Sequence, residues 1–131
     1  MTRSKIISSA SVLLVSDVVE SANWYRDKLG FSYDKFYGQP PDFCILERDN
    51  FNIMLSQVKD TSEIKPNWKT VEKMWNIYFW VDDVEAIYEE FQKSGATIDY
   101  TLYLTPYGGK EFGINDPDGY DVAFGQVVRS R

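Results

Sequence analysis

The sequence contains no histidine. This absence removes the side chain that most often acts as a general base near neutral pH and most often binds transition metals. A single cysteine, Cys44, rules out an intrachain disulfide and fits a reducing compartment. The apolar run at residues 12–15 is too short for a signal-peptide core or a membrane span. We therefore predict a cytoplasmic protein without a membrane partner.

Basic residues are also scarce, with 14 Lys and Arg against 20 Asp and Glu and a net charge of −6. Phosphate backbones would be repelled, so a nucleic-acid partner is not expected. A cationic ligand would be attracted, although the same acidic balance also serves solubility. Aromatic residues are abundant, at 16% of the chain, and must fill a core, line a pocket or form an interface.

The length of 131 residues predicts a single domain, 1–131, built from an internal repeat. Asp17 and Asp83 are helix N-cap candidates 66 positions apart, and Gly30 and Gly95 mark the helix ends. Each half reads as a strand, a helix and three strands. The expected helices are 18–29 and 84–94, and the expected strands are 12–15, 31–37, 43–47, 51–56, 77–81 and 98–104, with a loop of one helical turn at 58–72.

The last two strands form a predicted hairpin at residues 111–126. Its turn is Asp116-Pro117-Asp118-Gly119, in which proline fixes φ and glycine permits a positive φ. Apolar residues alternate on both sides of this turn, as in a β-hairpin.

With the repeat, the helix openings and the Asp-Pro-Asp-Gly hairpin, the chain resembles the vicinal-oxygen-chelate superfamily, which includes glyoxalases, bleomycin resistance proteins and extradiol dioxygenases. The matching segments are 15–31, 81–95 and 111–126. The resemblance implies an α+β fold of two βαβββ repeats, at about 6–57 and 75–127, whose curved mixed sheets surround a cup and carry the helices outside. One fold of this kind hosts many chemistries.

In the family, metal-using members carry histidine or glutamate at four positions facing the cup. The matching positions here are Ala10, Met54, Asn76 and Ala123. Alanine has no donor atom and methionine sulfur is a soft ligand, so this set does not suit magnesium, manganese or zinc. We therefore expect no metal and no cofactor, and closest resemblance to the metal-free bleomycin-resistance-like members.

Strand alternation gives the residues expected to face the cup. The small side chains at the former metal positions would leave space, aromatic rings would form flat walls, and a few polar groups would remain. The ligand-binding residues we predict are Asn52, Met54, Asn76, Tyr78, Trp80 and Asp121. Such a site favours a small, planar or cationic organic ligand. Large side chains that simply fill the cup would give the same composition.

We assign no catalytic residue. Cys44 lies in an expected strand with no histidine to activate it, so a buried structural thiol is the simpler interpretation. The acidic pairs have local explanations as caps, an exposed helix face or a turn; they are Asp82-Asp83, Glu89-Glu90 and Asp116/Asp118.

The function predicted by the resemblance is metal-free small-molecule binding, with antibiotic resistance of the bleomycin type by sequestration. It also implies a homodimer. The first alternative is a metal-dependent lyase, isomerase or dioxygenase with an atypical site that uses Asp121, Glu111 or Glu47. The second is a structural or interaction module with a filled cup.

Overall fold

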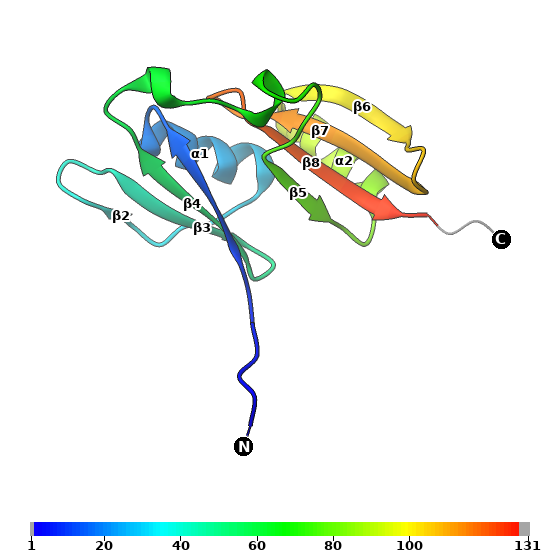
Figure 1. Cartoon of the computed structure of the whole chain (residues 1–131), viewed down its shortest axis with the longest axis horizontal. Helices are drawn as coiled ribbons and strands as arrows, with labels where there is room; N and C mark the ends of the chain where they lie inside the picture. Colours follow the sequence, from blue (N-terminus) through cyan, green and yellow to red (C-terminus); the bar gives the residue numbers. More distant parts are fainter. Residues whose placement is uncertain (1, 129–131) are drawn as a thin grey trace. The chain divides into compact units, whose positions relative to one another are not determined.

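The structure, a computed structural model, describes residues 2–128. The chain divides into two compact units, Met1–Glu63 and Ile64–Arg131, called here the first and the second unit. Each contains one α-helix lying along one face of a four-stranded mixed sheet (Figure 1). The predicted α+β class and the two βαβββ repeats are confirmed. That both repeats form one domain stays a prediction.

The first unit has the strand order β1-β4-β3-β2, in which β1 runs parallel to β4. Helix α1 packs on β3 and β4. The elements are β1 (Ala10–Val15), α1 (Val18–Leu29), β2 (Phe36–Tyr37), β3 (Phe43–Arg48), β4 (Phe51–Gln57) and the short 3-10 helix η1 (Thr61–Glu63).

The second unit repeats this arrangement with the order β5-β8-β7-β6, in which β5 runs parallel to β8. Helix α2 packs on β6, β7 and β8, and a cluster of phenylalanine rings fills the space between helix and sheet. The elements are the 3-10 helix η2 (Asn67–Lys69), β5 (Ile77–Trp80), α2 (Val84–Ser94), β6 (Ile98–Leu104), β7 (Gly109–Asn115) and β8 (Asp121–Val127).

Both helices begin and end where the sequence predicts. Asp17 accepts a hydrogen bond from the backbone N–H of Glu20, and Asp83 accepts one from that of Ala86, each at 3.0 Å. The C-caps Gly30 and Gly95 have φ of 72° and 81°, the left-handed region that glycine adopts without steric cost.

Each helix has a second N-terminal cap, a glutamine side chain from a neighbouring strand, which the sequence pattern did not predict. Gln57 accepts a hydrogen bond from the N–H of Val18 at 2.8 Å, and Gln126 accepts one from that of Val84 at 2.9 Å. Gln57 is the last residue of β4 and Gln126 the second-last of β8, so the last strand of each repeat fixes the first turn of its helix.

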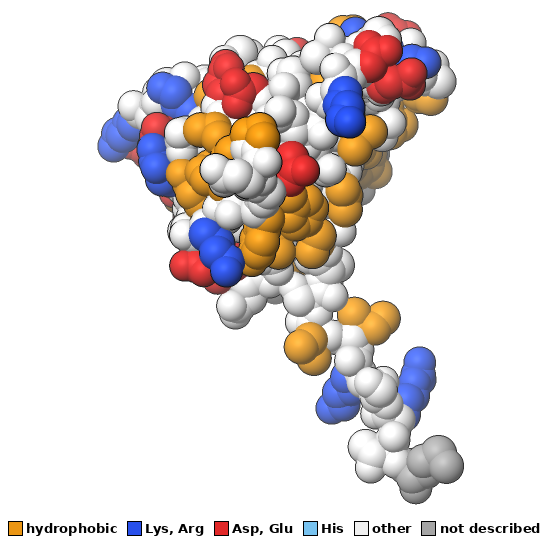
Figure 2. Space-filling model, turned by 90° about the vertical axis from the view of Figure 1, so that its left-hand side faces the viewer, with side chains coloured by type: hydrophobic (Ala, Val, Ile, Leu, Met, Phe, Trp, Pro, Cys, Tyr) orange, Lys and Arg blue, Asp and Glu red, His pale blue; other side chains and the backbone are white. Residues whose placement is uncertain are grey.

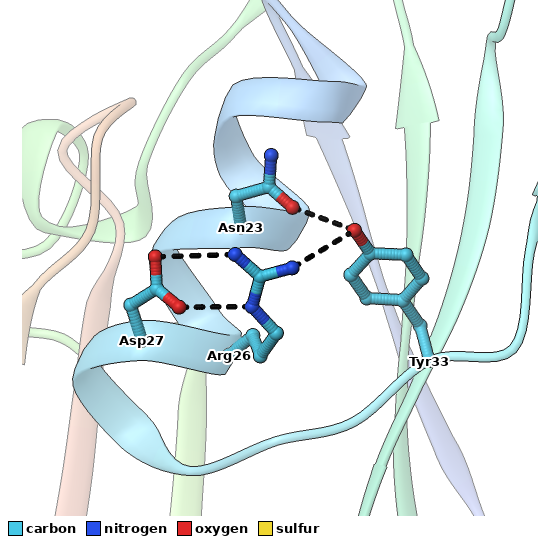
Figure 3. A network of polar contacts seen from close by, with 4 residues as sticks. All are labelled: Asn23, Arg26, Asp27 and Tyr33. Carbon is cyan, nitrogen blue, oxygen red and sulfur yellow. Dashed lines mark hydrogen bonds and ion pairs between the residues drawn. The ribbon is translucent and has the colours of Figure 1, made fainter.

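The predicted strand at 31–37 is wrong over most of its length, because only Phe36–Tyr37 pairs as β2 and Ser32 forms an isolated bridge with Glu47. Tyr33 turns to helix α1 instead (Figure 3). Its hydroxyl donates to Asn23 at 2.6 Å and accepts from Arg26 at 3.4 Å, while Arg26 also pairs with Asp27. These side-chain bonds hold Tyr33 against the helix, between the bridge at Ser32 and the short strand β2.

The loop expected at 58–72 contains two short 3-10 helices, η1 and η2, rather than one turn. The hairpin turn before β8 is confirmed: Oδ1 of Asp116 accepts hydrogen bonds from the N–H groups of Asp118 and Tyr120, and Gly119 has a φ of 85°. Within residues 2–128, no helix has the length and apolar composition needed to cross a membrane.

The predicted strand register is confirmed in both sheets. In the first unit Leu13 and Val15 of β1 and Ile53 and Leu55 of β4 are buried. The residues that alternate with them face the other side of the sheet, where Ala10 pairs with Asn52 and Val12 with Met54. In the second unit residues 121–125 are all buried, and the ring contact of Phe124 with Phe91 of α2 shows which side chains of β8 face the helix. We call the face of each sheet that its helix does not cover the open face.

Candidate ligand-binding site

The open face of the second unit contains a cavity of about 640 Å³. A volume of roughly 300–1,000 Å³ is typical of sites for small organic ligands. Four aromatic rings and three carboxyl groups make up most of its lining. The lining residues are Lys73, Trp75, Asp99, Tyr100, Thr101, Tyr103, Pro106, Tyr107, Glu111 and Asp121.

Glu111, on β7, is the polar centre of this face and is only 1% exposed. Its Oε1 accepts hydrogen bonds from the hydroxyls of Tyr78, at 2.9 Å, and Tyr107, and its Oε2 accepts one from Tyr100 at 2.8 Å. The indole N–H of Trp75 donates to the Tyr100 hydroxyl at 2.9 Å. Three donors therefore satisfy a buried carboxylate that would otherwise be costly to remove from water.

Two glycines make this arrangement possible, because each lies directly beneath a tyrosine that reaches Glu111. A Cβ at Gly113 would lie 2.7 Å from Cδ1 of Tyr100 and closer still to Cε1. A Cβ at Gly125 would lie 2.7 Å from Cζ of Tyr78 and closer still to its hydroxyl. Only a residue without a side chain allows these rings to approach the strands so closely.

The phenols around Glu111 remain protonated donors over the whole physiological range. Burial, followed by the hydrogen bond to Glu111, raises the pKa of Tyr78 and of Tyr100 far above the ordinary value. The same two causes raise the pKa of Tyr107 to about 12. The three phenols consequently form a fixed scaffold of donors and rings, and none of them exchanges a proton near pH 7.

Asp121, the first residue of β8, differs from Glu111 because one of its two carboxyl oxygens has no donor. It is 2% exposed, and its Oδ1 is the one buried side-chain nitrogen or oxygen within residues 2–128 that has no hydrogen-bond partner. Burial, and after it the neighbouring carboxyl of Asp99, together raise the pKa of this carboxyl to about 8. An unpartnered buried acceptor at the wall of a cavity is a natural contact for a ligand donor.

The six residues predicted to bind ligand fall on both units. Asp121 lines the cavity, and Tyr78 reaches it through Glu111. Trp80 is 63% exposed, with its ring centre 4.7 Å from that of Tyr78. Asn76 directly precedes β5, and its side-chain oxygen accepts from the N–H of Asn67 at 2.8 Å.

The other two predicted residues, Asn52 and Met54, lie on β4 in the first unit and are half-buried. Asn52 donates its side-chain N–H to the carbonyl of Leu46 at 3.1 Å. Both belong to the open face of the first sheet, and their role in binding stays a prediction.

Sequence reasoning missed Trp75, Asp99, Tyr100 and Tyr107 as lining residues, and it considered Glu111 only as a substitute metal ligand. One available signal was the spacing of Glu111 and Gly113, which share a face of β7. A glycine inside a strand often marks a site where another group approaches the backbone closely.

The residues at the family's metal positions do not fit a divalent ion. Ala10 and Met54 lie on β1 and β4, and Ala123 pairs with Tyr78 and Gly113 in the second sheet. Two alanines, a thioether and one amide do not make a site for a hard cation. Among residues 2–128, no group of three or more His, Cys, Asp or Glu side chains is arranged to hold a metal.

Cys44 is buried in β3, where its thiol lies 3.8 Å from the carbonyl of Lys35. Burial raises its pKa to about 11, so the thiolate needed for nucleophilic attack is scarce at neutral pH.

The model of the Glyoxalase/Bleomycin resistance protein/Dioxygenase superfamily matches residues 7–124. No curated protein sequence is significantly similar to the chain. Among solved structures, a bleomycin-binding protein from bleomycin-producing Streptomyces verticillus, complexed with copper(II)-bleomycin, is similar with a TM-score of 0.68 at 21% identity, covering 98% of this chain and 100% of that one.

Two further structures share the fold. TnmS3, an antibiotic binding protein from Streptomyces sp. CB03234, has a TM-score of 0.69 at 19% identity, with 97% of this chain and 98% of that chain covered. A glyoxalase-related enzyme from Clostridium phytofermentans has a TM-score of 0.72 at 16% identity, with 95% and 98% covered. Antibiotic-binding proteins and an enzyme thus share this architecture.

Proposed function

Since the chain belongs to the glyoxalase/bleomycin resistance protein/dioxygenase superfamily, we propose that it binds a small planar organic molecule without a metal and confers antibiotic resistance by sequestration. The cavity of the second unit is the binding site. The observation that carries this proposal is a hollow walled by aromatic rings in which one buried carboxylate oxygen lacks a partner.

The rings supply the area for stacking. Trp75, Tyr100, Tyr103 and Tyr107 line the cavity, and stacking on such rings contributes about 0.5–1.5 kcal/mol beyond burial of area. The hydrogen bonds of Tyr100 and Tyr107 to Glu111 fix two of these rings before a ligand arrives, which lowers the entropy cost of binding. We propose that Tyr78 and Trp80, at the edge of the same face, extend this wall.

Two of the similar structures support the proposal, since one is a bleomycin-binding protein and the other an antibiotic-binding protein. The donor-poor residues at the family's metal positions support it further, because they offer no metal site through which a guest would be activated. Protection would then follow from mass action, with the bound antibiotic unable to reach its target.

Titration with bleomycin and a panel of planar cationic antibiotics, followed by tryptophan fluorescence, tests this function. At least one compound is expected to quench the emission, and Trp75→Phe is expected to remove most of the change. Trp24→Phe, on α1 of the first unit, is the matched control and should leave the change intact. Trp80→Ala is expected to weaken binding roughly five-fold, the loss of about 1 kcal/mol of stacking.

Two outcomes would contradict the proposal. The first is no quenching by any compound in wild-type protein. The second is a stoichiometric divalent metal in protein purified without chelator, which would favour the lyase, isomerase or dioxygenase alternative.

We also propose that the protein is a cytoplasmic homodimer. The first unit exposes apolar side chains on its open face, Val12 and Leu14, and in the extended segment before β1, Ile6 and Ile7. Figure 2 shows hydrophobic side chains along this N-terminal segment and on the surface near it. Exposed apolar side chains that gather in one part of a protein are typical of an interface.

Light scattering coupled to size-exclusion chromatography is expected to give twice the mass of one chain. Val12→Asp, which places a charge on the exposed apolar face, is expected to shift the protein to monomer. Glu20→Lys, a charge change on the exposed side of α1, should leave the dimer unchanged. A wild-type monomer at tens of micromolar concentration would contradict the dimer.

A further inference from the structure

We propose that the guest of this cavity is a planar cation whose N–H group binds Oδ1 of Asp121, and that it enters in exchange for one proton held by Asp121 beside Asp99. This inference rests on the proposed function, because it assigns the ligand class of the same site. It adds a charge requirement and a proton exchange that small-molecule binding alone does not imply.

The first argument is which oxygens are available to a ligand. Both carboxylate oxygens of Glu111 are taken by phenol donors. Oδ1 of Asp99 accepts from the side-chain N–H of Asn115 at 3.3 Å. Oδ1 of Asp121 has no donor, although it is buried and lines the cavity. A ligand N–H would supply the missing donor, and a charged one would do so about twice as strongly.

The second argument is charge. The cavity is lined by the carboxyls of Asp99, Glu111 and Asp121 and by a single cationic side chain, Lys73. Because burial weakens solvent screening, a positive ligand is favoured over a neutral one of the same shape. The aromatic faces of Trp75, Tyr103 and Tyr107 favour the same sign, since a ring attracts a cation above its plane.

The third argument is the proton. The titratable groups near Asp121 on the same face are Asp99 and Tyr100 of β6 and Glu111 of β7, and Lys73 belongs to the same cavity lining. Two of these are acids that disfavour a further negative charge, and the phenol stays neutral. The pKa of Asp121 is raised to about 8, so its carboxyl is mostly neutral at pH 7. A cation stabilises the ionised form, and the displaced proton passes to the solvent.

The sign of the pH dependence follows directly. A cation binds the ionised carboxyl, whose fraction rises from about one-tenth at pH 7 to about nine-tenths at pH 9 when the pKa is about 8. The apparent affinity for a permanent cation should therefore increase roughly ten-fold over this range. A neutral ligand of the same shape should show no such increase.

The test compares 9-aminoacridine, which is cationic over most of this range, with acridine, a neutral ring system of the same shape. We expect wild-type protein to bind 9-aminoacridine about ten-fold more tightly at pH 9 than at pH 7, and more tightly than acridine at both. Calorimetry in buffers of different ionisation enthalpy should detect release of about one proton per cation bound at pH 7.

The informative variant is Asp121→Asn, which is expected to bind 9-aminoacridine no better than acridine and without pH dependence. Acridine binding at the wild-type level would show that this variant is folded and the cavity intact. Asp82→Asn, an exposed carboxyl removed from the same unit, is the matched control and should behave as wild type.

The outcomes separate the two proposals. If both acridines bind equally, or if Asp121→Asn keeps the preference and its pH dependence, the charge recognition is overturned while the binding function stands. If neither compound binds the wild-type protein, both proposals are overturned.

Discussion

Gly113→Ala is expected to destabilise the protein by about 2 kcal/mol, the range for forcing extra volume into a packed site. The new methyl group would lie 2.7 Å from Cδ1 of Tyr100 and 2.8 Å from Oδ1 of Asp121. Tyr100 would have to leave the sheet surface and give up its bonds to Glu111 and Trp75. Urea unfolding measures the loss, and ligand titration should show weakened binding.

A double-mutant cycle identifies the ring of Tyr100 as the cause. In a Tyr100→Ala background the methyl at Gly113 has room, so the second substitution should cost far less than it does in wild type. Gly109→Ala is a milder control, because its Cβ would meet the Thr105 hydroxyl at 3.2 Å. If Gly113→Ala lowered the unfolding free energy equally with and without the Tyr100 ring, the contact between the new methyl group and that ring would not be the cause of the destabilisation.

Glu111→Gln is expected to cost about 2–3 kcal/mol of unfolding free energy, because hydrogen bonds to a charged group contribute roughly 1.5–3 kcal/mol each. An amide offers one acceptor oxygen in place of two, so the three phenols of Tyr78, Tyr100 and Tyr107 can no longer all donate. Thermal or urea unfolding at pH 7 measures the change. Glu85→Gln, an exposed carboxyl paired with Lys110, should cost much less.

Phenol titration gives a readout that a general loss of packing would not produce. Burial is the larger cause of the raised pKa values of Tyr78 and Tyr100, and Glu111 is the second. In Glu111→Gln these values should fall but stay above the ordinary one. In wild type, the raised phenol pKa values contribute stability that is present below pH 10 and is lost as the pH rises further. If the phenol absorbance of the wild-type and Glu111→Gln proteins followed the same curve at high pH, Glu111 would not raise the pKa values of these tyrosines.

Local signals predicted most of the fold correctly. The caps Asp17 and Asp83 and the glycines after each helix fix α1 and α2 at their predicted bounds. These signals act over a few residues, so no tertiary contact is needed to interpret them. The failed strand at 31–37 shows the limit, because Tyr33 is held by side chains of α1 rather than by its own propensity.

The site was harder to predict because its members meet only through strand pairing. Tyr100 lies opposite Gly113 and Tyr103 opposite Glu111, with register shifts on both sides of Tyr100. An irregular strand places two residues three positions apart on one face, which simple alternation forbids. Trp75 comes from the loop before β5 and reaches the site by a hydrogen bond to Tyr100.

The sequence by itself determined the repeat, the helices and the face of each regular strand. It also determined that Ala10, Met54 and Ala123 offer no hard ligand atom to a metal. Residue type and short-range periodicity carry all of this information. The tertiary structure alone decided that Glu111 is saturated by phenols whereas Asp121 has a free oxygen. Which acceptor remains for a ligand depends on side chains from four strands and two connecting loops, and only the folded sheet brings them within hydrogen-bonding distance.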